Sequence, residues 1–369
     1  MRHRSAAFFS SIVMLLCALP LFAAPPSLTP GEQDLVDRAL QGQLEIFARN
    51  YPRADAIFSS LSADYPTSPA GPFGSMAVLE MKMIEREDFH LEKELLAEAA
   101  EGHRRVGAIM QQYEPSTWDL FLAGSLLGLD GFFKARKGQW WEAYTLGGKS
   151  RQLFRRVKKI DPGFTDADFG LGMYLYWRSV FTRDLWFLSM FPDRRAEGIA
   201  IVERVAKGGH FAKDLAKVNL AIMYFEEGRF ADAEGVLKEY VGRYPDNVIL
   251  HKLYGKVLIS LKRYDEAIAQ FNHMLRVVPG ARAPHYFKGA ALVIQGNPAR
   301  LADAERELRL FLKASQGKYW PAHAHYWLGR LHLLRGEKEA SDREFKEAVR
   351  LYPEIETAVK RVRGLGGGV

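Results

Sequence analysis

The sequence contains a single cysteine, Cys17, among its 369 residues. One cysteine cannot form an intramolecular disulfide, and it cannot supply the several thiolates of a structural zinc site. Cys17 also lies in an N-terminal segment that we expect to be removed, which would leave the remaining chain without a thiol nucleophile. Packing alone must therefore hold the fold together.

Dense runs of lysine and arginine are also missing. The 51 basic residues outnumber the 44 acidic residues to give a net charge of +7, to which Arg2 and Arg4 contribute two charges. Spread along the chain, this excess is too dilute for a nucleic-acid-binding surface, but it favours anionic protein partners or membrane surfaces. The 48% hydrophobic and 26% charged residues are typical of a globular protein.

Residues 1–24 have the order of a secretory signal peptide. A basic leader, Arg2–Arg4, precedes the apolar stretch Ala6–Leu16, and small residues follow before Pro25. The apolar stretch is too short for a stable membrane anchor. We therefore expect cleavage near Ala23 or Ala24 and an exported protein, periplasmic or extracellular, with an uncleaved anchor as the alternative.

The dominant feature of the rest of the chain is an internal repeat. Counted from Gly255, three residues follow at offsets of 12, 16 and 24, namely Ala267, Phe271 and Pro279. The same offsets give Ala233, Leu237 and Pro245 after Ala221, Ser341, Phe345 and Pro353 after Gly329, and Ala54, Phe58 and Pro66 after Gly42. Four registers with one spacing indicate a repeated structural unit.

These residue types resemble the consensus of the tetratricopeptide (TPR) repeat, including the large–small pairs Tyr254-Gly255 and Leu328-Gly329 and the helix breakers Gly228 and Gly336. The resemblance implies two antiparallel helices per unit, packed closely through the small residues and stacked into a superhelix. We predict an all-α TPR-type solenoid of about eight helix-pair units.

The regularity of the repeat divides the chain. We expect TPR-like units with a divergent middle over residues 31–213, and regular units with a capping helix over 214–362. A flexible tail is expected over 363–369, because residues 364–369 are mostly glycine.

The resemblance also implies a partner-binding groove, because the first helix of each TPR unit lines the concave side of the solenoid. The corresponding positions in this chain are Lys252, Lys256, Tyr286, His323, Tyr326 and Arg330. Basic and aromatic side chains suit an extended peptide with acidic residues or a free carboxylate. Lys256 stands where the carboxylate clamp of the family needs asparagine, so we do not assign the clamp. The alternative is a set of solvated residues without a ligand.

The divergent middle contains a concentration of aromatic residues, Trp177, Phe181, Trp186, Phe187 and Phe191. Arg178, Arg183 and Asp184 interrupt this stretch and exclude a transmembrane helix. Two interpretations remain. The aromatic side chains fold back into the solenoid core, or they form an exposed patch that touches a partner or a membrane surface.

Sites for chemistry are scarce. Residues 143–150 follow a relaxed phosphate-loop pattern, but a phosphate-binding loop needs a buried strand before it, and the preceding residues have a helical pattern. His251, His285 and His325 occupy the fourth position of consecutive units, where we expect interior histidines with satisfied hydrogen bonds. We predict a non-enzymatic scaffold of the cell envelope that binds a protein or peptide and needs no cofactor and no nucleic acid. The alternatives are a membrane-associated TPR protein that acts through the aromatic segment 177–191 and a nucleotide-binding enzyme that uses 143–150.

Overall fold

The computed structural model describes residues 29–183, 192–315 and 317–364. Within these ranges the chain folds into α-helices and two short 3-10 helices, and it forms no strand. Helices α1 to α16 make eight consecutive pairs, and α17 follows the last pair. The predicted all-α TPR-type solenoid of about eight helix pairs is therefore confirmed.

The helices have these bounds: α1 Pro30–Phe47, α2 Tyr51–Asp64, α3 Ala70–Arg86, α4 Glu92–Met110, α5 Thr117–Arg136, α6 Trp140–Ile160, α7 Thr165–Arg183, α8 Arg195–Gly208, α9 Lys213–Glu226, α10 Phe230–Arg243, α11 Val248–Ser260, α12 Tyr264–Val277, α13 Ala283–Gln295, η2 Pro298–Arg300, α14 Leu301–Ala314, α15 Tyr319–Leu334, α16 Lys338–Leu351, η3 Pro353–Ile355 and α17 Glu356–Gly364.

Local sequence explains where many of these helices begin and end. Thr29 caps α1 in a capping box with Glu32, and Asn247 accepts a hydrogen bond from the backbone of Leu250 at the start of α11. The turns after α9 and α15 contain Gly228 and Gly336 at φ of 72° and 77°. Glycine adopts this left-handed conformation without steric cost, so these two positions end the first helix of their units.

An aromatic ring lies directly over the small residue in the sixth and eighth units. A Cβ added to Gly255 would lie 2.4 Å from the ring of Phe271, and one added to Gly329 would lie 2.6 Å from Phe345. The divergent third unit has the same arrangement, because Phe154 of α6 covers both Gly124 of α5 and Gly170 of α7. In these units a glycine makes room for a ring, whereas in the seventh unit Leu308 covers Gly289 in the same way.

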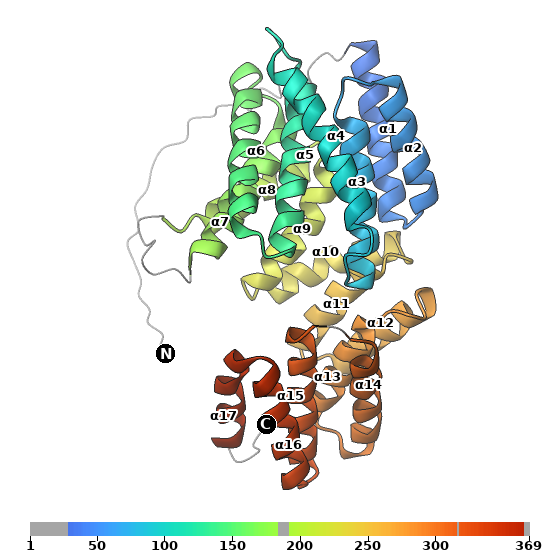
Figure 1. Ribbon diagram of the computed structural model, residues 1–369, viewed down its shortest axis with the longest axis vertical. Coiled ribbons are helices and arrows are strands. Elements are labelled where there is room, and N and C mark those ends of the chain that lie inside the picture. Colours follow the sequence, from blue (N-terminus) through green and yellow to red (C-terminus); the bar gives the residue numbers. More distant parts are fainter. Residues whose placement is uncertain (1–28, 184–191, 316, 365–369) are drawn as a thin grey trace, which may run out of the picture.

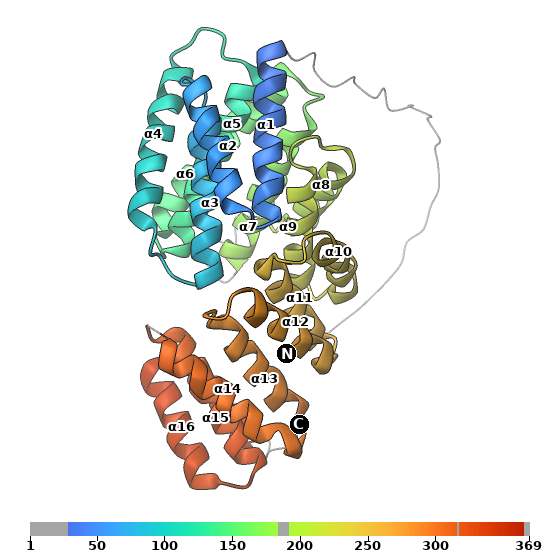
Figure 2. The same ribbon diagram turned by 90° about the vertical axis from the view of Figure 1, so that its right-hand side faces the viewer.

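The solenoid brings its first units back onto later ones. In Figure 1 and Figure 2, helices α1–α9 form one end of the molecule and α13–α16 the other, with α10–α12 between them. The end of α3 reaches α11, and Asn247 donates a hydrogen bond of 2.9 Å to the carbonyl oxygen of Phe47. The first two units are therefore fastened to the sixth.

Candidate partner-binding surfaces

The two groove lysines of α11 face other parts of the same chain. Lys252 Nζ lies 3.1 Å from Glu87 Oε1, and the two side chains are 19% and 22% exposed. Lys256 Nζ lies 4.7 Å from the ring centre of Phe225, and no carboxylate of the described residues lies within ion-pair distance of it. Burial lowers the pKa of Lys256, and the charge of Glu226 offsets this only in part. Lys252 can therefore bind an acidic partner only by releasing Glu87.

Arg282, which is not among the predicted groove residues, makes a second contact with the end of α3. Arg282 Nη2 donates to the carbonyl oxygens of Arg86 and Glu87 at 2.9 and 3.3 Å, and Arg282 Nη1 donates to that of Ala314 at 3.0 Å. The last carbonyls of a helix carry partial negative charge and attract cations. The C-terminal end of α3 thus occupies the basic part of the predicted groove.

The remaining groove residues gather in the last two units. Tyr286 is only 7% exposed, its hydroxyl accepts a hydrogen bond of 3.1 Å from Trp327 Nε1, and burial raises its pKa to about 12. The guanidinium of Arg330 stacks 4.9 Å from the centre of the Trp327 ring, while Tyr326 packs against Phe345. Tyr286 is therefore a buried packing residue and is not available to a partner. Arg330 has no carboxylate partner among the described residues.

His323 belongs to a cluster that we call the C-terminal aromatic surface, defined by Tyr319, Trp320, His323 and Tyr352. The Tyr319 ring lies 4.5 Å from His323 and 5.1 Å from Tyr352, and Trp320 lies 5.2 Å from Tyr286. Tyr319 and Trp320 remain 48% and 40% exposed. Burial lowers the pKa of His323 and so disfavours its charged form. The consensus groove positions did not include Tyr319, Trp320 or Tyr352.

A second group of aromatic residues lies on the neighbouring helices α6 and α7. Trp177 and Phe181 are 37% and 44% exposed, so they lie on the surface, and Trp186, Phe187 and Phe191 fall outside the described residues. The ring of Trp140 lies 5.4 Å from Phe181, and Trp141, which is 76% exposed, stacks near Tyr144. We call Trp140, Trp141, Tyr144, Trp177 and Phe181 the α6–α7 aromatic surface. Trp177 and Phe181 therefore do not fold into the core, and their contact with a partner or a membrane stays a prediction.

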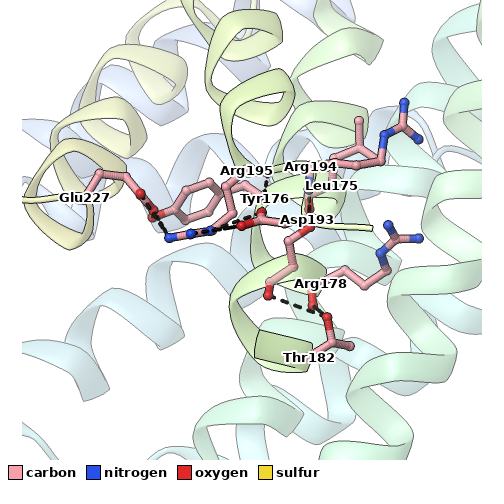
Figure 3. A network of polar contacts seen from close by, with 9 residues as sticks. Leu175, Tyr176, Arg178, Thr182, Asp193, Arg194, Arg195 and Glu227 are labelled. Carbon is pink, nitrogen blue, oxygen red and sulfur yellow. Dashed lines mark hydrogen bonds and ion pairs between the residues drawn. The ribbon is translucent and has the colours of Figure 1, made fainter. Parts of the chain in front are cut away.

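A polar network fastens the start of α8 beside this surface (Figure 3). Arg195 lies between two carboxylates, 2.9 Å from Glu227 and 2.9 Å from Asp193, and the hydroxyl of buried Tyr176 donates to Glu227 at 3.0 Å. Ser179 Oγ of α7 accepts a hydrogen bond from the backbone of Arg194. Every carboxylate of the network faces an arginine, so the network serves to position α7, α8 and α9.

The phosphate-loop pattern at 143–150 lies within the continuous helix α6. Ser150, the last residue of the pattern, is buried and donates a hydrogen bond of 2.7 Å to the carbonyl oxygen of Gly124. Amides inside a helix are already bonded to the preceding turn and cannot surround a phosphate. The structure therefore offers no phosphate-binding loop at this segment.

The repeated histidines bond to the second helix of their own units. His251 contacts Gln270 at 2.6 Å, and its other ring nitrogen lies 2.9 Å from the carbonyl oxygen of Pro245. The equivalent partners are Glu307 for His285 and Glu344 for His325, both at 2.6 Å. All three histidines have the predicted hydrogen-bond partners, but only His251 is buried, and His285 and His325 are partly exposed. Their contacts join the two helices of three units.

Two family models of the tetratricopeptide repeat match this chain, over residues 224–290 and 322–355. No curated protein matches it. A TPR protein of Thermus thermophilus is 18% identical, with 53% of this chain and 98% of that chain covered and a TM-score of 0.39. The C-terminal part of a TPR protein of Cytophaga hutchinsonii is 12% identical, with 87% and 97% covered and a TM-score of 0.34. MamA MSR-1 is 20% identical, with 48% and 98% covered and a TM-score of 0.35.

The assignment rests on the two family models and on the helix pairs that they cover. Residues 224–290 run from the end of α9 into α13, and residues 322–355 span α15, α16 and η3. Stacked helix pairs of this kind present extended surfaces to protein partners. This chain is a tetratricopeptide-repeat protein and a scaffold for protein interaction.

Proposed function

We propose that this chain is an exported, non-enzymatic scaffold that holds a protein partner on the C-terminal aromatic surface. The exposure of Tyr319 and Trp320 carries the proposal, because large aromatic side chains on a supported surface are the usual anchors of protein interfaces. Arg330 lies on the same helix without a carboxylate partner among the described residues, so a partner segment with an acidic group fits best. Part of the groove is already filled by α3, which favours a partner seated on the last two units.

Trp320→Ala and Arg330→Glu are expected to weaken partner binding. Loss of an aromatic anchor costs about 2 kcal/mol of binding free energy, which is on the order of a 30-fold increase in Kd. The partner is first identified by placing a photo-crosslinking residue at position 319, and the Kd is then measured by calorimetry with purified proteins.

Lys338→Glu provides the matched control, since Lys338 is an exposed cation of α16 without an ion pair among the described residues. It should leave the Kd unchanged. Equal affinity of the wild type, Trp320→Ala and Arg330→Glu would show that the partner binds elsewhere. Thermal unfolding of each variant verifies that the repeats remain folded.

Export is the second element of the proposal and is supported by the leader, apolar stretch and small residues of segment 1–24. The mature protein should begin near Pro25, and it should be recovered from the periplasm or medium. N-terminal sequencing of the fractionated protein tests this. An intact N-terminus in the cytoplasmic fraction would contradict export, and an intact N-terminus in the membrane fraction would favour the anchor.

A further inference from the structure

Helix α6 has an unusual charge composition for a surface helix. Between Trp140 and Ile160 it contains one carboxylate, Glu142, near its N-terminus. Its cations are Lys149, Arg151, Arg155, Arg156, Lys158 and Lys159. Like charges this close repel one another and lower helix stability unless something neutralises them.

Contacts within the fold account for only half of these cations. Lys158 forms an ion pair of 2.9 Å with Asp168, and Lys159 beside it benefits from the negative end of the helix dipole. Arg151 lies over the ring of Tyr174 at 4.8 Å. Lys149, Arg155 and Arg156 have no carboxylate within ion-pair distance among the described residues, and Lys149 and Arg155 are exposed.

One of the unpaired cations, Arg155, lies on the same side of α6 as exposed aromatic side chains. Trp141, Tyr144, Gly148, Gln152 and Arg155 follow one another at intervals of three or four residues, which places them along one side of the helix. Trp141 and Tyr144 are 76% and 48% exposed on that side. Trp141, Tyr144 and Arg155 thus lie along one side of α6, and Lys149 lines the same open hollow as the two rings.

We propose that this face binds the surface of an anionic phospholipid membrane. Tryptophan, tyrosine and phenylalanine side chains are stable at the headgroup level of a bilayer, where their rings leave water and their polar atoms stay hydrated. Arg155 lies on this side, and Lys149 and Arg156 each follow a residue of this side by one position. The lipid phosphates supply the negative charge that the fold does not give these three cations. No helix of the described residues is long and apolar enough to cross a bilayer, so the contact is peripheral.

The position of α6 favours a membrane over an acidic protein. It is the second helix of its unit, and in a TPR solenoid the first helices line the concave side that receives peptides. In Figure 1, α6 and α7 lie at the outer edge of the molecule. This side carries an open hollow lined by Trp141, Tyr144, Lys149, Arg151 and Tyr174. A basic and aromatic face at the outer edge of the array fits a lipid surface.

Vesicle co-sedimentation of the full chain tests the proposal. The wild type should bind vesicles of phosphatidylglycerol and phosphatidylcholine, and it should bind pure phosphatidylcholine much more weakly. The variant K149Q/R155Q/R156Q should lose about 100-fold in partition coefficient, because each cation contributes about fivefold. The variant K338Q/R343Q/K346Q changes the same charge on exposed positions of α16 and should bind like the wild type. Segment 1–24 is present in all variants, so its own contribution to vesicle binding is the same in each.

Tryptophan fluorescence measures the insertion of the aromatic side chains into the bilayer surface. Tryptophan fluorescence should shift to the blue on addition of anionic vesicles, and Trp141→Ser should reduce both the shift and the affinity. Tyr113→Ser, which alters a side chain that is 94% exposed in the loop before α5, is the matched control. Equal vesicle binding by the wild type and K149Q/R155Q/R156Q would overturn the proposal. Binding to a polyglutamate peptide through the same three cations, without vesicle binding, would overturn it in favour of an acidic protein. Neither result depends on the C-terminal aromatic surface.

Discussion

Replacing Gly170 by alanine should destabilise the N-terminal units by about 3 kcal/mol. A Cβ at this position would lie 2.0 Å from Cε2 of Phe154, inside any permitted contact distance. The ring is only 4% exposed and packs among buried neighbours, so it can move only by displacing them. The gain in helix propensity from glycine to alanine, about 1 kcal/mol, offsets a small part of this cost.

The midpoint of urea unfolding followed by circular dichroism measures the effect. Gly148→Ala is the matched control, because Gly148 also lies inside a helix, α6, and a Cβ there would meet nothing within 4 Å. This control should stabilise the protein slightly. The double variant Gly170→Ala/Phe154→Leu should recover part of the loss, since a smaller side chain leaves room for the methyl group. A Gly170→Ala protein as stable as the wild type would show that the ring does not fix the spacing of α6 and α7.

Arg136→Ala is the second substitution with a large expected effect, about 3 kcal/mol at pH 7. The carboxylate of Glu80 on α3 is fully buried, and its contact of 2.7 Å with Arg136 Nη1 of α5 joins the second unit to the third. The other oxygen of Glu80 has no hydrogen-bond partner. Removing the arginine therefore leaves a buried charge without compensation.

The loss should depend on pH in a defined direction. Burial already raises the pKa of Glu80, against the opposing effect of Arg136, and removal of Arg136 raises it further. A carboxyl group whose pKa is higher in the folded state costs stability while it is ionised, and the cost disappears as the pH falls through that pKa. The difference in unfolding free energy between Arg136→Ala and the wild type should therefore shrink from pH 7.5 to pH 5.

The double variant Glu80→Gln/Arg136→Ala isolates this cause, because it has no charge to protonate. The loss of unfolding free energy in this double variant, relative to the wild type, should change less between pH 7.5 and pH 5 than the loss in Arg136→Ala. Urea unfolding at both pH values gives the unfolding free energies of the wild type and of the two variants. If Arg136→Ala lost the same unfolding free energy at pH 7.5 and at pH 5, the buried Glu80 would not be ionised in this variant.

The contacts that the sequence predicted are local ones. The offset of 16 residues from Gly255 to Phe271 and from Gly329 to Phe345 became a ring packed on a glycine, because both residues lie in one helix pair. In the third unit the same contact joins Gly124 to Phe154 over 30 residues, since α5 and α6 contain 20 and 21 residues. A search at fixed offsets therefore could not find it, and the middle of the chain looked irregular although its packing is the same.

The repeat period and residue types alone determined that this chain is an all-α array of about eight helix pairs, because a helix pair is specified by contacts within some 34 residues. Only the tertiary structure decided which predicted groove residues are available. Lys252 is neutralised by Glu87 across 165 residues of sequence, and Arg282 holds the end of α3 across 195. The curvature of the solenoid sums small rotations from every unit, so contacts between its ends follow from the whole stack and from no single repeat. Helix α6 lies at the outer edge of the array (Figure 1), and among the described residues Lys149, Arg155 and Arg156 have no carboxylate partner there.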